Sequence, residues 1–175
     1  EHGALLIYDQ VQCGMGRTGK LFAHQWVDGA KPDIMCVAKG VGGGFPFGAC
    51  LTTEETGIVM QTGSHGSTYG GNPLAMAVGN AVWDIISDEA FLEDVRRVSG
   101  TLAQSLKSIA DTHPDKVVAV TGKGLLTGIQ LKALPKPVQG ICREKNLLVG
   151  VAGNNVLRVA PPDRKSTRLN SSHEQ

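Results

Sequence analysis

The sequence has no excess of charge of either sign. Its 175 residues carry 17 Lys+Arg against 16 Asp+Glu, so the formal net charge is +1 at pH 7. A protein that binds nucleic acid normally has a basic surface and a clear positive excess. We therefore predict no nucleic-acid partner.

Long apolar runs and a basic leader are also missing. The longest uncharged apolar stretches, residues 4–8 and 147–152, fall far short of the ~18 residues that a membrane span needs. The opening Glu1-His2-Gly3 is not the basic start of a signal peptide. With 41% hydrophobic residues the composition is that of a globular domain, and we expect a cytoplasmic location with no membrane partner.

Cysteines are few and widely spaced. Cys13, Cys36, Cys50 and Cys142 form no C-x-x-C pair, and no histidines cluster around them. The spacing therefore predicts neither a zinc site nor a disulfide framework.

Glycine, in contrast, is abundant in the first half. Of 23 glycines, 16 lie before residue 80, which suggests that backbone must approach something closely there. The chain also begins with Glu rather than Met and opens directly into an apolar strand, so we interpret it as a fragment of a longer protein.

The apolar pattern changes along the chain. Its first half predicts buried strands that end in glycine loops, typical of α/β proteins, and its second half predicts an α+β module, with a boundary near residue 89. The first two strands are expected to be buried on both faces. Strands are predicted at 5–8, 33–38, 49–52, 117–120, 125–131, 147–151 and 156–159, and helices at 21–27, from 53, at 73–87, 88–113 and 137–145.

Asp9 and Lys39 stand at the ends of two successive buried strands. Alone, Asp9 is more often a capping residue and Lys39 a snorkelling surface lysine. A buried carboxylate there would need a cationic partner, and a desolvated lysine would have a depressed pKa and be nucleophilic. Together they match what pyridoxal phosphate requires, a lysine for the Schiff base and an acid for the pyridine nitrogen. If the extended backbone continues, Val11 shares the side of Asp9 and can press on the ring, while Gln12 projects toward a ring substituent.

The loop Gly14 to Gly19 leaves a second hypothesis open, a nucleotide-binding α/β module. It has the pattern G-x-G-x-x-G after a strand, with Asp33 about 20 residues on. Asp33 begins the second strand, however, whereas a dinucleotide site has its acid at that strand's end. The same loop resembles a phosphate-binding G-x-x-x-x-G-K through Lys20, but Leu21 lacks the hydroxyl that would bind magnesium. A tight structural loop is favoured.

Three segments carry a family resemblance, residues 5–19, 32–40 and 65–73. They resemble the signatures of the class III, fold-type I pyridoxal-phosphate aminotransferases, and the resemblance extends from residue 1 to 162. It implies the second half of a large domain over 1–88, with a mixed, mostly parallel sheet. A truncated α+β small domain would follow over 89–162.

The resemblance implies a role for each matching residue. Lys39 would be the Schiff-base lysine, Asp9 would pair with the pyridinium nitrogen, Val11 would pack on the ring and Gln12 would bond its phenolic oxygen. The remaining three matches are Ser67 and Thr68, which would cross a homodimer interface to the partner's cofactor phosphate, and Arg158, which would hold a substrate carboxylate. If the resemblance is set aside, the alternative interpretations are an ordinary polar loop for Ser67 and Thr68 and a surface-paired strand arginine for Arg158.

The implied activity is transamination. Within the class the chain most resembles enzymes that pass the terminal amine of N-acetylornithine to 2-oxoglutarate, giving glutamate and an acetylated semialdehyde in arginine biosynthesis. Succinylornithine, ornithine and 4-aminobutyrate remain alternative donors, and an inactive remnant that only dimerises is a third hypothesis.

Two features depart from the family. Position 10 is Gln where the family usually has Glu, which removes one charge beside the cofactor. The segment 163–175 loses the expected apolar strand and resembles the translation of a sequencing-library adapter. We predict that it is non-native and disordered, and that its basic residues form no nucleic-acid patch.

Overall fold

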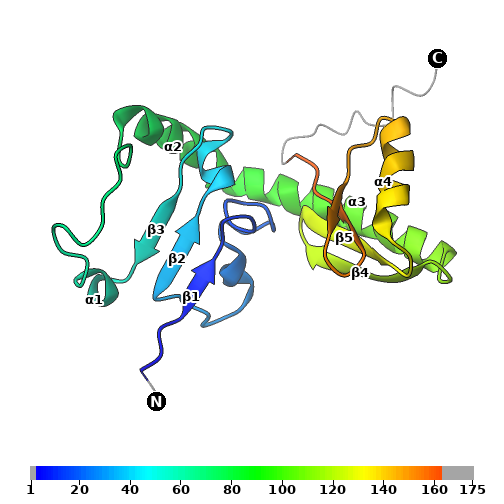
Figure 1. Ribbon diagram of the computed structural model, residues 1–175, viewed down its shortest axis with the longest axis horizontal. Helices are drawn as coiled ribbons and strands as arrows, with labels where there is room; N and C mark the ends of the chain where they lie inside the picture. The colour runs from blue at the N-terminus through cyan, green and yellow to red at the C-terminus, as the bar shows by residue number, and fades with distance from the viewer. Residues whose placement is uncertain (1–2, 163–175) are drawn as a thin grey trace. The chain divides into compact units, whose positions relative to one another are not determined.

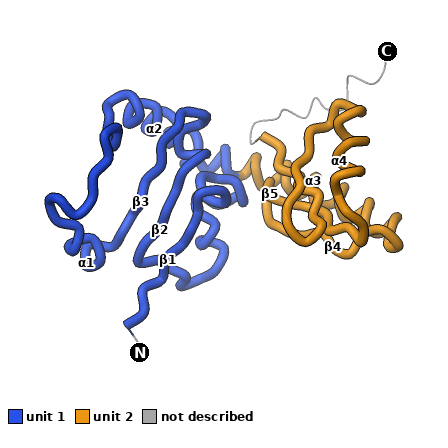
Figure 2. The backbone as a smooth tube through the Cα atoms, viewed as in Figure 1, with its two compact units in different colours: residues 1–92 blue, residues 93–175 orange. Residues whose placement is uncertain are grey.

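The structure is a computed structural model that describes residues 3–162. The tail predicted over 163–175 lies outside the described residues. The chain divides into two compact units, residues 1–92 and 93–175 (Figure 2). The division falls inside one helix, a few residues after the boundary predicted near residue 89.

A three-stranded sheet forms the centre of the first unit (Figure 1). Its strands are β1 (Ile7–Asp9), β2 (Ile34–Val37) and β3 (Ala49–Thr52), in the order β1-β2-β3. β1 and β2 are parallel, whereas β2 and β3 are antiparallel. The sheet is therefore mixed, and the three strands predicted in this half are confirmed, the first shifted by two residues.

The burial predicted for the first strand is wrong. Ile7 is 60% exposed and Leu5 and Leu6 are exposed as well, so no described element packs over them. On β2, Met35 and Val37 are buried on one face, but Ile34 and Cys36 on the other face are half-buried, so burial on both faces is only partly found there. The apolar run was long enough to specify a strand, but burial on both faces needs covering layers that the described chain does not supply.

The helices of the first unit begin at capping residues. α1 (Glu54–Gly57) starts after Thr53, whose hydroxyl accepts from Thr56 N–H at 3.4 Å. α2 (Pro73–Ile86) starts after Asn72, whose side-chain oxygen accepts from Ala75 N–H at 2.9 Å. The Asn-Pro start predicted from the sequence is confirmed, since the cap satisfies an N–H that has no partner within the helix. In place of the helix predicted at 21–27 there is a short 3-10 turn, η1 (Ala23–Trp26).

A small apolar core joins these elements. Met15 from the glycine loop, Met35 and Val37 from β2 and Ile86 from α2 are buried against one another. The loop after β2, which includes the 3-10 helix η2 (Lys39–Gly42), contacts α2. The core thus holds the loop that follows Lys39.

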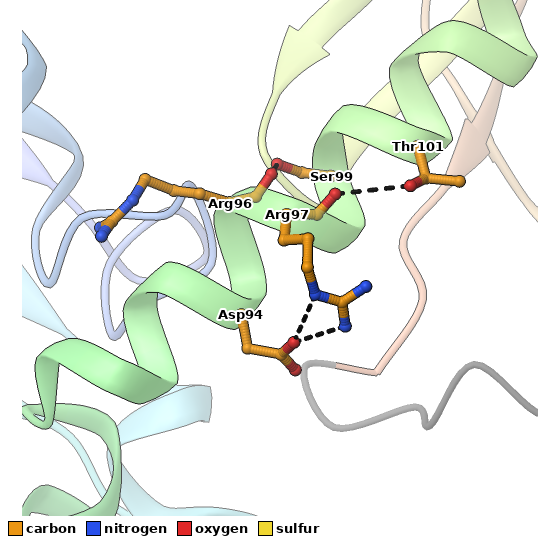
Figure 3. A network of polar contacts seen from close by, with 5 residues as sticks. All are labelled: Asp94, Arg96, Arg97, Ser99 and Thr101. Atoms are coloured by element: carbon orange, nitrogen blue, oxygen red, sulfur yellow. Dashed lines mark hydrogen bonds and ion pairs between the residues drawn. The ribbon is translucent and has the colours of Figure 1, made fainter.

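α3 (Glu89–Thr112) is the longest helix and spans the division between the units. Asp88 caps its start by accepting from Ala90 N–H at 3.0 Å. On its surface Arg97 donates two hydrogen bonds to one oxygen of Asp94, and the Thr101 hydroxyl donates to the Arg97 carbonyl (Figure 3). Because both ion-pair side chains are about half exposed, the pair contributes well under ~1 kcal/mol.

The second unit has its own antiparallel sheet. Its strands are β4 (Val117–Lys123), β5 (Leu126–Leu131), β6 (Gly150–Ala152) and β7 (Val156–Val159), in the order β4-β5-β7-β6. Leu106 of α3 packs with Val117 and Ile129 to form the core. The helix predicted at 137–145 is α4 (Pro135–Glu144).

Residues 147–149 do not form the predicted strand start. Leu148 is 86% exposed, and Leu147 N–H donates instead to the Cys142 carbonyl at 2.8 Å. Asn146 has φ +59° and its N–H donates to the Arg143 carbonyl. These bonds form a Schellman motif that closes α4, so the strand begins only at Gly150. None of the helices within residues 3–162 is long and apolar enough to cross a membrane.

Candidate cofactor site

Asp9 ends β1 and turns the chain. One carboxylate oxygen, Oδ1, accepts from Val11 N–H at 3.0 Å, the geometry of an Asx turn. The side chain is exposed, so the buried carboxylate that the strand pattern predicted is not found in the described chain. Within residues 3–162 the second oxygen, Oδ2, has no hydrogen-bond partner, which leaves an acceptor for a ligand N–H.

Val11 and Gln12 lie in the turn rather than in a strand. The chain leaves the extended conformation after Asp9, so the alternation that would place Val11 beside Asp9 does not apply. Val11 is half-buried and Gln12 is exposed. The Asx turn explains this difference, because it bends the backbone within two residues.

Gln10 is a structural residue that the sequence analysis noted only as a departure. It is 3% exposed. Its Oε1 accepts from Ala23 N–H at 2.6 Å, and because a backbone amide can only donate, this bond fixes the orientation of the side-chain amide. The Gln10 amide nitrogen therefore donates to His24 Nδ1, also at 2.6 Å. Gln10 thus ties the turn after Asp9 to η1.

Lys39 follows β2 by two residues and has an unusual backbone. Its φ is +51°, in the left-handed region that costs a non-glycine residue about 1–2 kcal/mol. The side chain is exposed, so the desolvation that the apolar strand suggested is not present in the described residues. No hydrogen bond or ion pair joins the amine to another residue within 3–162. Strain of this kind is concentrated at functional sites.

The parallel pairing brings Asp9 and Lys39 to one edge of the sheet. Asp9 is opposite Cys36, and Gln10 N–H donates to the Cys36 carbonyl at 2.9 Å. Lys39 follows Cys36 by three residues, so both groups emerge where their strands end. In open α/β sheets ligands bind at this carboxyl end.

The glycine loop 14–19 is structural. Gly14, Gly16, Arg17 and Gly19 all donate their N–H groups to carbonyls within residues 10–21, so these amides are not available to a phosphate. Met15 turns into the core, and a Cβ at Gly40 would lie 3.0 Å from its Cβ. The loop leads into turns rather than a long helix. These contacts favour the tight structural loop over the nucleotide-binding hypothesis.

Ser67 and Thr68 lie on an exposed loop before α2. Their hydroxyls make no hydrogen bond to another residue in the described part of the chain. The turn is closed by backbone, with Gly70 N–H donating to the Ser67 carbonyl at 3.4 Å. Both hydroxyls are therefore available to a ligand.

Arg158 belongs to the second unit and lies on β7 between two glycines. Gly128 is opposite it on β5 and Gly150 on β6. A Cβ added at Gly150 would lie 3.1 Å from Arg158 Nε, so the missing side chain leaves room for the arginine. No carboxylate of residues 3–162 pairs with its guanidinium.

A pocket of about 350 Å³ lies on the β1 side of the first unit. Asp9, Gln10, Cys13 and His24 contribute to its wall, but Lys39 does not. Burial raises the pKa of the Cys13 thiol above its ordinary value, a backbone hydrogen bond partly offsets this, and the nearby Asp9 charge raises the pKa further. Because Lys39 is not in the wall, the pocket alone is not the cofactor site.

The family Aminotransferase class-III matches residues 1–164. The chain belongs to the class III aminotransferases. Its curated relatives include the acetylornithine aminotransferases of Mesorhizobium japonicum, 54% identical, and Brucella melitensis, 49% identical, each over 162 residues. Each match covers 93% of this chain and 40% of the relative. This aminotransferase chain therefore spans about 40% of the length of the relatives it matches.

Solved structures agree with this assignment. The acetylornithine aminotransferase from Elizabethkingia anophelis matches with a TM-score of 0.83 and 37% identity, covering 94% of this chain and 42% of that one. The N-acetylornithine aminotransferase from Stenotrophomonas maltophilia matches with a TM-score of 0.82 and 34% identity, covering 95% and 43%. Both are fold-type I enzymes, so this chain has that fold.

Class III aminotransferases use pyridoxal phosphate, and the groups present fit it. A lysine amine and a carboxylate oxygen, neither with a hydrogen-bond partner among residues 3–162, lie at the ends of adjacent parallel strands. These are the donor types that bind the cofactor's carbonyl and pyridine nitrogen.

Proposed function

We propose that this chain forms part of an aminotransferase that transfers the terminal amine of N-acetylornithine to 2-oxoglutarate. The products would be N-acetylglutamate semialdehyde and glutamate, a step of arginine biosynthesis in the cytoplasm. The observation that carries the proposal is Lys39, whose amine has no partner in the described part of the chain and whose backbone is strained, beside the end of the Asp9 strand. The printed names of the relatives support the donor.

Lys39 and Asp9 have complementary roles in this proposal. Pyridoxal phosphate, when bound, supplies a carbonyl for an amine and a ring that withdraws electrons from the substrate. Lys39 Nζ would hold the cofactor and, once the substrate amine has displaced it, would move a proton from the substrate carbon to the cofactor carbon as general base and then general acid. The Asp9 carboxylate would accept a hydrogen bond from the ring N–H and keep that nitrogen protonated.

Other residues position the reactants. Val11 would pack on the ring, and Gln12 would donate to its phenolic oxygen. In a homodimer, the Ser67 and Thr68 hydroxyls would donate to the phosphate of the cofactor bound by the partner subunit. The exposure of both residues supports this role. Arg158 would bind a substrate carboxylate through its planar fork, with Gly150 providing room. In domain terms we propose 1–88 for the large domain and 89–162 for the small one.

Cofactor trapping tests the role of Lys39. The protein is mixed with pyridoxal phosphate, reduced with borohydride and digested, and the modified lysines are located by mass spectrometry. We expect one dominant adduct on Lys39 and its loss in Lys39→Ala. The exposed lysines Lys31 and Lys136 are internal controls. Equal labelling of all three would overturn the assignment.

The donor is tested in a chimaera. Residues 1–162 replace the matching segment of the Mesorhizobium japonicum enzyme, and turnover is compared for N-acetylornithine, succinylornithine, ornithine and 4-aminobutyrate. N-acetylornithine should have the highest kcat/KM. Another preferred donor would contradict the substrate, whereas an inactive chimaera that still labels at Lys39 would contradict the activity of this sequence.

A further inference from the structure

Two cysteines face each other across the first sheet. Cys36 on β2 is directly opposite Cys50 on β3, and their sulfur atoms are 4.0 Å apart. Cys50 is exposed and Cys36 half-buried. The sequence spacing of 14 residues predicted no disulfide, because only the strand register brings these thiols together.

The backbone around the pair has the geometry that a cross-strand disulfide needs. The Cys36 carbonyl accepts from Gln10 N–H at 2.9 Å, and Ile34 N–H donates to the Leu6 carbonyl at 3.2 Å. The backbone N–H and C=O groups of Ile34 and Cys36 therefore point toward β1 and away from β3. Cys36 and Cys50 thus form a non-hydrogen-bonded pair, in which Cα atoms lie about 4.5 Å apart. That spacing is within the roughly 4.4–6.8 Å that disulfides span.

We propose that Cys36 and Cys50 are an oxidation site, forming a reversible disulfide within one chain when the protein meets hydrogen peroxide. The Cys50 thiolate sulfur attacks one peroxide oxygen, the O–O bond breaks, and the other oxygen leaves as water after taking a proton. Cys36 then loses its proton, its sulfur attacks the sulfenic sulfur of Cys50, and a second water leaves as the S–O bond breaks. The two thiols lose two electrons and two protons, and the peroxide gains them.

The contacts assign the order of attack. The Cys36 thiol donates its hydrogen bond to the Cys50 sulfur. This bond, followed by burial and by the charges of Cys50 and Asp9, raises the pKa of Cys36 above its ordinary value. Because Cys50 is exposed and Cys36 is half-buried, Cys50 is the sulfur that meets peroxide first.

The site adjoins the candidate cofactor groups. Asp9, Cys36 and Cys50 are directly opposite one another in a row across three strands, so their side chains share one face of the sheet. Closing the bridge must draw the two sulfurs together by about 2 Å beside Asp9. The proposal does not depend on the activity, because it concerns only the register of β2 and β3.

Disulfide mapping tests the proposal. The full chain is treated with hydrogen peroxide, unfolded in N-ethylmaleimide and digested without reductant. We expect a Cys36–Cys50 linked peptide, a loss of two hydrogen masses from the intact chain and alkylated Cys13 and Cys142. Treatment with a dithiol should restore both thiols. Links among other cysteines in equal yield, links between chains, or no link would each overturn the proposal.

Two controls test whether the link depends on the folded sheet or only on the short separation of Cys36 and Cys50 in the sequence. Cys50→Ser should abolish the link, whereas Cys142→Ser should leave it unchanged, with circular dichroism confirming that both variants fold. In urea, the rate of link formation should fall roughly tenfold or more, since the strands no longer align the sulfurs. An unchanged rate in urea would contradict a role for the sheet.

Discussion

The two units differ in how far they bury their sheets. In the second unit, β5 has three successive buried residues, 127–129, and Leu106 of α3 packs with Ile129. In the first unit, β3 has no buried residue and β1 only the half-buried Tyr8. The candidate cofactor residues nevertheless belong to the first unit. Packing therefore defines the regular sheet of the second unit, whereas turns, strand ends and specific hydrogen bonds position the reactive groups of the first.

The largest expected effect tests the difference in burial. Leu106→Ala should lower the free energy of unfolding by about 2–5 kcal/mol, because it leaves a cavity in the second core. Ile7→Ala, on β1, should change it by less than ~1 kcal/mol. Denaturant titration measures both, and the exposed Ile109→Ala is a control on the same helix. Equal losses at positions 106 and 7 would show that the first sheet is packed as tightly as the second.

A second prediction concerns the polar buried contact of the first unit. Gln10→Ala should cost about 1–3 kcal/mol, because it leaves the Ala23 N–H and His24 Nδ1 without their partner. Gln12→Ala, which removes an exposed amide two residues away, should be nearly neutral. Thermal unfolding of the pair is the measurement. Similar midpoints for the two variants would refute a structural role for Gln10.

A third prediction uses backbone strain. Lys39→Gly should be more stable than Lys39→Ala by about 1–2 kcal/mol, since glycine adopts φ +51° without steric cost. A similar difference is expected between Asn146→Gly and Asn146→Ala, because Asn146 has φ +59° and neither variant retains the asparagine that tolerates this region. Denaturant midpoints compare the four variants. No advantage for glycine at 39 would mean that the backbone there is unstrained.

The smallest effect on stability is expected at Gly150. Gly150→Ala should change the free energy of unfolding by less than ~1 kcal/mol, because its methyl group meets only the flexible side chain of Arg158. In the chimaera it should nevertheless raise KM for 2-oxoglutarate, as the guanidinium is displaced. Gly153→Ala, which meets open space, is the matched control. An equal KM for both variants would argue against a positioning role.

Local sequence signals predicted most of the elements. Asn72-Pro73 and Asp88 mark helix starts because their side chains satisfy backbone N–H groups that any helix leaves free. The strand start predicted at Leu147 and Leu148 is wrong, because Asn146 lies in the left-handed region and two backbone hydrogen bonds close α4 there. The apolar letters alone do not distinguish a strand from a helix terminus.

The candidate site was only partly predictable. Asp9 and Lys39 were found because each ends an apolar run, and the family resemblance named the remaining matches. Gln10 was noted as a departure, but its partners Ala23 and His24 lie more than ten residues away. The Asx turn ends the extended conformation before Val11, and it depends on one hydrogen bond from Val11 N–H to the Asp9 side chain. A prediction based on the alternation of side chains along a strand does not take such a bond into account.

The family, the order of the elements and the chemical types at the site can be read from the sequence, because they follow from short motifs, caps and apolar periodicity. Tertiary structure decided which distant residues meet. Strand pairing placed Cys36 between Asp9 and Cys50, and packing turned Met15 against the loop that follows Lys39. These contacts depend on register and on the close approach of backbones, which no local pattern specifies.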